Sequence, residues 1–303
     1  MGQSRHQQSL GPAATFLAFV LALPAAMLFA AAAAPWVQAG LAPLAVFPLH
    51  RVFSRLTLLG VVVITVWLLL RHRLWSPSLL GFVGPWPRFL QRAGVGLLAG
   101  AAVMSLALVP LFLLDVREWS DRAPIALQGW LLLGLKGLGS GLAVALIEET
   151  FFRGALQGAL QRLGALRLAL LAVPVFYSAV HFLGRAGRVA YEDVNATSGF
   201  VALQGFFAGY AAPLTILDAF VALWFVGLLL ALVRLRWGDL AGSIGLHAGF
   251  VAVIAVCRRA SAPAPDNDWS FLVGSFDGLL GVWIALLTAL CCIVLWRLPP
   301  RTG

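Results

Sequence analysis

Long apolar segments recur along this chain, and each is about as long as a helix that crosses a membrane. A bilayer core requires about 20 mainly apolar residues in one helix, so a chain of such segments has few folds open to it. Eight candidate spans follow one another: residues 13–34, 56–70, 93–114, 128–162, 165–182, 213–233, 240–256 and 271–296. We therefore predict an all-α fold, a polytopic transmembrane helical bundle with about eight spans.

The composition supports a lipid environment. Hydrophobic residues make up 61% of the 303 positions and charged residues only 11%, whereas about a quarter of the residues in a soluble domain are charged. The net charge of +9 does not indicate a nucleic-acid partner, because the basic residues are scattered singly between apolar runs, as at the ends of membrane helices. The cysteines match no disulfide or thiolate metal pattern. We interpret them as packing residues: Cys257, Cys291 and Cys292.

The predicted helices fall into three parts. Residues 1–127 form N-terminal membrane helices, residues 128–258 form a core, and residues 259–303 contain a C-terminal membrane helix. The first span is too long for the core of a signal peptide, which has about 7–15 residues. Its alanine-rich end resembles a cleavage site, but we favour an uncleaved anchor. The bias toward alanine, glycine, leucine and arginine suits a bacterial genome, so we expect an integral protein of the bacterial inner (cell) membrane.

Residues 128–162 form the longest predicted helix. Its 35 residues would extend about 52 Å at 1.5 Å per residue, which exceeds a bilayer core of about 30 Å. We expect this helix to tilt, to break near residues 137–139, or to protrude. Residues 76–92 are predicted to lie at the membrane interface, and residues 183–212 to form a polar, glycine-rich loop that is in part re-entrant.

Few ionisable residues lie inside the predicted spans, and each is costly there, so each is a functional candidate. Glu149 and Arg153 are four residues apart and can pair on one face of a helix. Glu148 lies about 100° away around the same helix, so one cation cannot serve both carboxylates equally. The less neutralised carboxylate is suited to act as a general base.

Two histidines can join this acidic pair. With a turn near Gly164, Glu149 lies 15 residues before the turn and His181 lies 17 residues after it. In an antiparallel helical hairpin these positions reach nearly the same depth, about 22–26 Å from the turn. His247 is surrounded in sequence by small residues that allow close helix packing, although taken alone it is as well explained as a core residue.

Three other intramembrane charges are weaker candidates. Lys136 lies about three turns before Glu148 and is expected to snorkel or to pair structurally. Asp218 and Asp277 have no partner at a predictable depth. We therefore leave these three residues out of the predicted site.

At these residues the chain resembles the CPBP family, which includes the type II CAAX prenyl endopeptidases and the bacterial Abi-like membrane proteases. Glu148-Glu149-x-x-x-Arg153 matches the first family motif. Tyr177-x-x-x-His181 matches the second, with tyrosine at a position where phenylalanine is usual. His247 begins the third motif, but Val251 stands at the position of its asparagine. The resemblance covers about residues 128–258, the predicted protease core.

The resemblance implies roles for five residues. Glu148 and His181 would activate a water for attack on the scissile peptide, and Glu149 and Arg153 would shape and polarise the pocket. His247 would stabilise the oxyanion, a task shared with asparagine in typical members. Losing one oxyanion donor costs about 10²–10³ in rate, so the valine puts efficiency in doubt unless Ser243 or another donor substitutes.

The predicted activity is therefore that of an intramembrane endopeptidase acting on a membrane-associated peptide or protein. We expect no cofactor, with zinc as the alternative, because two histidines and a glutamate also suit that metal. Two other functions stay open. A catalytically impaired binding or immunity protein would explain the valine, and a proton-coupled transporter would use the same acidic residues as a relay, although the inverted repeats of many transporters are not evident.

Overall fold

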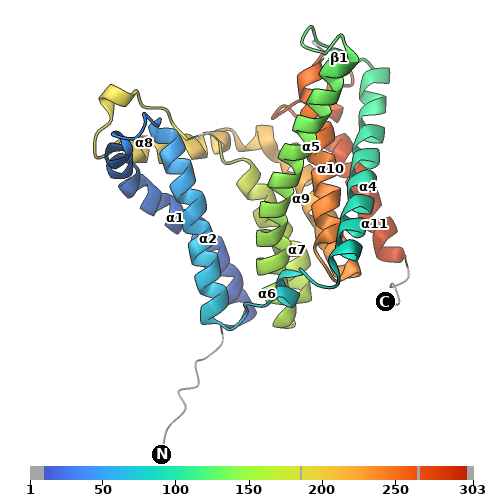
Figure 1. Ribbon diagram of the computed structural model, residues 1–303. Helices are drawn as coiled ribbons and strands as arrows, with labels where there is room; N and C mark the ends of the chain where they lie inside the picture. The colour runs from blue at the N-terminus through green and yellow to red at the C-terminus, as the bar shows by residue number, and fades with distance from the viewer. Residues whose placement is uncertain (1–9, 185, 265–266, 299–303) are drawn as a thin grey trace, which may run out of the picture. The chain divides into compact units, whose positions relative to one another are not determined.

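The computed structural model describes residues 10–184, 186–264 and 267–298, and most of them are helical (Figure 1). The helices in chain order are α1 (Pro12–Leu41), α2 (Leu49–Arg71), α3 (Pro77–Leu80), α4 (Trp86–Leu113), α5 (Leu127–Glu149), α6 (Gln157–Arg162), α7 (Leu166–His181), α8 (Ser198–Phe206), α9 (Leu217–Trp237), α10 (Ala241–Ala260) and α11 (Val282–Arg297). The prediction of an all-α membrane bundle is confirmed.

Short elements connect the helices. A π-helical segment, η1 (Thr150–Leu156), joins α5 to α6. Two short strands pair antiparallel: β1 (Arg117–Trp119), which follows α4, and β2 (Ser261–Pro263), which follows α10. The single 3₁₀ turns are η2 (Tyr191–Asp193), η3 (Phe207–Tyr210), η4 (Pro213–Ile216) and η5 (Ser270–Leu272).

Six helical segments are long and apolar enough to cross a membrane: Pro12–Leu41, Leu49–Arg71, Trp86–Leu113, Leu127–Arg162, Pro213–Trp237 and Ala241–Ala260. The two remaining predicted spans correspond to the shorter apolar helices α7 and α11, of 16 residues each. The last predicted span began too early, at residue 271. The chain there forms η5 and a turn in which the Asp277 carboxylate accepts hydrogen bonds from the backbone N–H groups of Leu279 and Leu280.

The longest predicted helix does not break at residues 137–139. α5 continues through them to Glu149, and the departure from α-helical geometry comes later, in η1. Gly137 and Gly141 instead bring α5 close to α10, since a Cβ at Gly141 would lie 2.6 Å from the carbonyl oxygen of Ala248. The glycines therefore serve helix packing and do not interrupt the helix.

The chain forms two compact units. The first comprises the described parts of Met1–Ser76, Ala159–Leu168 and Phe182–Ala211, and the second the described parts of Pro77–Gly158, Ala169–His181 and Ala212–Gly303. The predicted division at residues 127 and 258 stays a prediction.

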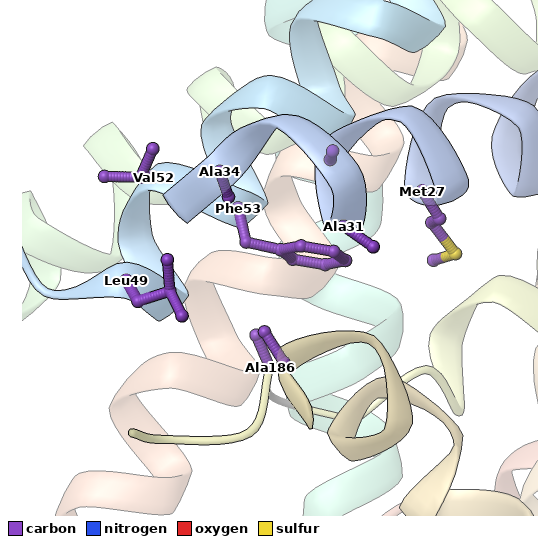
Figure 2. Close-up of a cluster of buried hydrophobic side chains, with 9 residues drawn as sticks. Met27, Ala31, Ala34, Leu49, Val52, Phe53 and Ala186 are labelled. Carbon is purple, nitrogen blue, oxygen red and sulfur yellow. The ribbon is translucent and has the colours of Figure 1, made fainter. Parts of the chain in front are cut away.

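In the first unit, α1 packs along α2, and α8 packs on α1. The core consists of small and aliphatic side chains around one ring. Figure 2 shows Phe53 of α2 directed toward Ala31 and Ala34 of α1, with Ala186 on the other side of the ring. The prediction of a loop over residues 183–212 was wrong in part, because α8 forms there. Gly199 allows α8 to approach the backbone of Ala31, which gives the helix a buried face.

In the second unit, α10 packs against α4, α5 and α9, and α11 packs against α9. Glycines make the contacts of α10 close on two sides. A Cβ at Gly245 would meet the carbonyl of Ala93 in α4, and Gly141 of α5 faces Ala248, as described above. Such small residues allow the van der Waals contact that holds membrane helices together. α10 is therefore fixed between two neighbours at the level of His247.

Candidate active site

The five predicted site residues all lie in the second unit, on the continuous segment α5–η1, on α7 and on α10. Glu148 and Glu149 end α5, Arg153 lies in η1, His181 ends α7, and His247 lies in α10. The predicted turn between the first two segments is confirmed, since α6 ends at Arg162 and a residue with φ of +74° follows at position 164, a glycine. The structure brings all five side chains together.

A buried ion network forms one half of the cluster. Glu149 Oε1 accepts a hydrogen bond from Arg153 Nη1 at 3.0 Å and one from His247 Nδ1 at 2.9 Å. Glu149 and Arg153 are 0% exposed and His247 is 3% exposed. Burying a charge is costly unless a partner and hydrogen bonds compensate for the lost water. The predicted pairing of Glu149 with Arg153 therefore forms, and His247 joins it. Among the described residues, Glu149 Oε2 and Arg153 Nε make no hydrogen bond.

Glu148 has a different environment, although it is the neighbouring residue. Its side chain is 29% exposed, and its Oε2 lies 3.8 Å from His181 Nε2 and 4.0 Å from His247 Nε2. Within the described ranges this oxygen makes no direct hydrogen bond. Glu148 is thus a carboxylate that faces two imidazoles without being neutralised by arginine.

The backbone fixes how each imidazole presents its hydrogens. His181 Nδ1 lies 2.7 Å from the carbonyl oxygen of Tyr177. A carbonyl only accepts, so Nδ1 carries the hydrogen, and in the neutral ring Nε2 is an acceptor. In the same way, His247 Nδ1 donates to Glu149. Both Nε2 atoms are therefore the free ends of oriented rings, and both point to Glu148.

Two residues that were not predicted from the sequence, or not predicted with this role, anchor the cluster to α9. Arg153 Nη2 donates to the carbonyl of Gly227 at 3.0 Å, and Gln157 Nε2 donates to the carbonyl of Ala231 at 3.1 Å. The two donors are four residues apart, and so are the two acceptors. A signal was present, because Gln157 is a polar residue in an apolar helix, one turn after Arg153.

Aromatic rings enclose the guanidinium of Arg153. Its Cζ lies 4.4 Å from the ring centroid of Tyr177 and 5.6 Å from that of Phe152, distances typical of cation–π contacts. The Tyr177 ring also lies 4.3 Å, centroid to centroid, from the ring of His181. The aromatic residue of the second motif therefore contributes packing against both the arginine and the catalytic candidate.

The local helix geometry changes at the motif itself. η1 begins at the residue after Glu149 and contains Arg153. π-helical turns are rare and occur often at functional sites, and an irregular turn depends on tertiary contacts to hold it. Here the bonds from Arg153 and Gln157 to α9 are such contacts.

The other predicted candidates lie elsewhere. Lys136 is exposed on α5. Asp218 accepts a hydrogen bond from the backbone N–H of Ala219 at 2.7 Å, and Asp277 pairs with Arg258. Ser243 is near His247 in sequence, but its hydroxyl donates to the carbonyl of Leu240 at 3.0 Å. The Ser243 hydroxyl hydrogen is thus engaged by a backbone carbonyl and does not serve as the oxyanion donor in this arrangement.

The three cysteines are free thiols. Cys257 and Cys292 are buried and Cys291 is partly buried, which fits the packing role predicted for them.

Zinc was the alternative to a metal-free site, and the donor atoms test it. Ligands about 2.0–2.1 Å from a tetrahedral zinc ion lie about 3.4 Å from one another. Glu148 Oε2 is 3.8 Å from the nitrogen of His181 and 4.0 Å from that of His247. Across the described part of the chain, no group of three or more His, Cys, Asp or Glu side chains is arranged to hold a metal ion. The separations from Glu148 are thus longer than in an ideal tetrahedral site, and zinc stays the alternative to a metal-free site.

Comparison with known families agrees with the geometry. Residues 129–253 match the model of a family described as type II CAAX prenyl endopeptidase, Rce1-like. This segment is Rce1-like. It contains all five candidate residues together with Tyr177, Val251 and the α9 carbonyls, so the resemblance seen in the motifs is confirmed. No curated protein and no solved structure matches this chain.

The Rce1-like segment and the apolar helices together define the protein at a coarse level. The family is a family of proteases, and the helices are those of an integral membrane protein. The chain is therefore an integral membrane protein with a segment similar to a protease family, and the five candidate residues of that segment lie in the second unit.

Proposed function

We propose that this protein is an intramembrane endopeptidase in which Glu148 and His181 activate a water molecule. The observation that carries the proposal is the position of the Glu148 carboxylate, which faces two oriented imidazoles at 3.8 and 4.0 Å. These separations are too long for direct hydrogen bonds. They suit a water that donates one hydrogen to Glu148 and the other to His181 Nε2.

The proposed reaction begins with attack of this water on the scissile carbonyl carbon. The water oxygen forms the new C–O bond, and one of its protons passes to the Glu148 carboxylate, which acts as the general base. The carbonyl oxygen becomes an oxyanion. When the tetrahedral intermediate collapses, the C–N bond breaks, and the proton held by Glu148 passes to the leaving amine.

His247 is proposed to donate a hydrogen bond to the oxyanion. Its Nδ1–H is already engaged with Glu149, so this role requires a second hydrogen on Nε2. Glu149 favours that doubly protonated ring by accepting its Nδ1–H. Arg153 holds Glu149 in place from the other side. Glu149 and Arg153 are thus positioning residues, which act through His247.

The proposed substrate is a peptide bond close to the membrane surface. The matched family carries the description prenyl endopeptidase, so a peptide with a prenylated carboxyl terminus is one substrate to test. If the organism is bacterial, as the composition suggests, a membrane-bound leader peptide is the better substrate. Both are membrane-associated, and the proposal includes the bacterial inner membrane as the location.

The experiment compares peptide cleavage by the full-length protein in detergent and in vesicles. Wild type is assayed beside Glu148→Ala and His181→Ala with a prenylated peptide and with membrane-anchored leader peptides. Glu118→Ala and His72→Ala are matched controls, because they remove the same side chains far along the chain from the motifs. We expect only the first two variants to lose cleavage.

One other function has an observation in its favour. Val251 replaces the asparagine of the third motif, and Ser243 does not supply the missing donor, so an inactive binding protein is the second candidate. That candidate predicts no cleavage by wild type, with stoichiometric binding of the same peptides instead. Equal cleavage by wild type, Glu148→Ala and His181→Ala would remove the catalytic assignment altogether.

A further inference from the structure

A groove of about 600 Å³ is lined by residues of α4, β1, α5 and α10 in the second unit. In Figure 1, β1 lies at one end of these helices. This volume falls within the range of about 300–1,000 Å³ typical of ligand pockets. The groove shares no lining residue with the candidate active site. The lining residues that matter here are Leu113 of α4, Trp119 of β1, Trp130 and Gly134 of α5, and Ala252 and Ala260 of α10.

The groove begins where the close contact of α5 with α10 ends. A Cβ at Gly137 would lie 2.9 Å from the carbonyl oxygen of Ala252, whereas a Cβ at Gly134 would meet nothing within 4 Å. From Ala252 to Ala260, α10 rises about 12 Å. The two helices are therefore in contact at Gly137 and leave a slot about 12 Å long beyond it.

The walls of this slot belong to three candidate membrane spans. Leu113 is 76% exposed and Val109, also in the lining, is 49% exposed. Apolar surface of this kind inside a bilayer is covered by lipid and not by water. The occupant is thus a lipid chain unless a protein segment displaces it.

Aromatic residues form the outer rim. The ring of Trp119 stacks on Phe112 with centroids 4.7 Å apart and meets the edge of Trp130 at 5.9 Å. Tryptophan concentrates at membrane interfaces. Among the described residues, neither indole N–H of this pair donates to a protein acceptor. Two donors are thus available to the ester or phosphate oxygens of a lipid.

Exposed charged residues of both signs are close in sequence to the lining residues Trp119 and Ala260. These exposed residues are Glu118, Asp121, Arg122 and Arg259. Arg259 precedes Ala260, whose carbonyl accepts a hydrogen bond from the backbone N–H of Ser120 at 3.0 Å. Guanidinium groups complement a phosphate and carboxylates complement an ammonium, so this edge suits a headgroup that carries both.

We propose that the groove is a binding site for one acyl chain of a bilayer phospholipid, with its headgroup at the rim formed by Trp119 and Trp130. The chain would run inward toward Ala252, which lies five residues after His247, or about 8 Å along α10. A lipid in this place fills the space between α5 and α10, and α10 is the helix that carries His247. The site is independent of the proposed cleavage reaction.

A matched pair of glycine variants tests the proposal. Gly134 and Gly139 both lie on α5, and a Cβ at either would meet nothing within 4 Å, but only Gly134 lines the groove. Full-length wild type, Gly134→Phe and Gly139→Phe are reconstituted in vesicles of phosphatidylethanolamine with phosphatidylglycerol and transferred to mild detergent. Native mass spectrometry then detects the phospholipid that each protein retains.

We expect wild type and Gly139→Phe to retain one phospholipid and Gly134→Phe to lose it. Equal retention by the two variants would overturn the proposal. A second measurement on wild type alone covers the case in which Gly134→Phe does not fold. A phospholipid with a photoreactive group near the chain end is expected to label residues 105–113 and 252–260, with labelling that saturates as its mole fraction rises. Labelling that is spread over the exposed helices and rises linearly would overturn it as well.

Discussion

The two units are both packed by small residues, but they bury different side chains. Among the described residues of the first unit, every buried polar side chain is uncharged: Thr15, Gln38, Thr57, Thr65 and Ser198. The second unit buries the charged residues Arg117, Arg234 and Asp239, and it also buries Glu149, Arg153 and His247 as one hydrogen-bonded cluster. An apolar interior with neutral polar groups is sufficient to hold helices together in a membrane. The buried ionic network of the second unit therefore requires an explanation other than stability.

Burying the network of Glu149, Arg153 and His247 costs free energy, which the apolar interior of the first unit avoids. Desolvating an ion is penalised by several kcal/mol even after relaxation, and well-packed hydrophobic residues are often as stable or more stable than a buried ion pair. The cluster uses one arginine and one histidine to hold Glu149, and it leaves Glu148 without such a partner. A catalytic role explains why Glu149 is paired and Glu148 is not, whereas a packing role alone does not.

The largest expected effect comes from Glu148→Gln. The amide keeps the size of the side chain but cannot accept a proton, so cleavage should fall by about 10²–10⁴, the usual contribution of a general base. Thermal stability should stay near that of wild type, because Glu148 is 29% exposed and makes no ion pair with arginine. Rate measurements and thermal denaturation in the same detergent check both statements, with Glu118→Gln as the control. Cleavage at the wild-type rate would falsify the role of Glu148.

Arg153→Met should have the next largest effect, on folding. It leaves Glu149 buried with His247 as its remaining partner, and breaking a buried pair costs about 3–5 kcal/mol. The double variant Glu149→Gln, Arg153→Met should recover part of this loss, since it removes the buried charge as well. Denaturant unfolding in mixed micelles measures both. A double variant that is less stable than the single one would show that the network stabilises the unit outright.

Gln157→Leu and Gln38→Leu compare the two units directly. Each removes a buried amide that donates to one backbone carbonyl, that of Ala231 or that of Phe47. Both should lose about 1 kcal/mol of stability. Only Gln157→Leu should lower cleavage, by about 10-fold to 10²-fold, because a small displacement of positioned groups is enough for that loss. Equal cleavage by the two variants would mean that Gln157 has a packing role alone.

How much of this site the sequence predicts depends on the range of each interaction. The pairing of Glu149 with Arg153 and the shared depth of the acidic pair and His181 follow from helix periodicity and one turn, which are local rules. The hydrogen bonds of Arg153 and Gln157 to the carbonyls of Gly227 and Ala231 do not follow from local rules. They depend on which face of α9 packs against η1 and α6. The π-helical turn was missed because it is stable only with those tertiary contacts.

The first unit shows the same limit. The apolar runs predict α1 and α2. The glycine-rich stretch after His181 has no clear period, so the sequence predicts a loop where α8 forms. Its Gly199 lies against the backbone of Ala31, a contact between segments far apart in the chain. Long-range packing of this kind leaves no periodic signal in a short segment.

Val251→Asn should have a smaller effect, and in the favourable direction. Residue 251 lies one turn after His247 on the same helix, and an amide there can add a second donor to the oxyanion. A single such donor accounts for about 10²–10³ in rate in enzymes built around it, so we expect a gain of about 10-fold in a site that has adapted to valine. The turnover of the same peptide by both proteins measures it, with Val251→Leu as the control for side-chain size. An unchanged rate would show that position 251 does not supply a hydrogen-bond donor to the oxyanion.

The smallest expected effect is that of metal chelation, for which we expect no change. The nitrogens of His181 and His247 lie at distances from Glu148 that do not match a tetrahedral zinc site, and their Nδ1 atoms are held by Tyr177 and Glu149. Such Nδ1 hydrogen bonds also orient histidine ligands in zinc sites, so the prediction rests on the separations from Glu148 alone. Cleavage should therefore be the same after dialysis against a strong chelator, and metal analysis of the active protein should find less than one zinc per chain. Loss of cleavage that returns on adding zinc would show that the rings do move, and that the substrate-bound site has a geometry different from the one described.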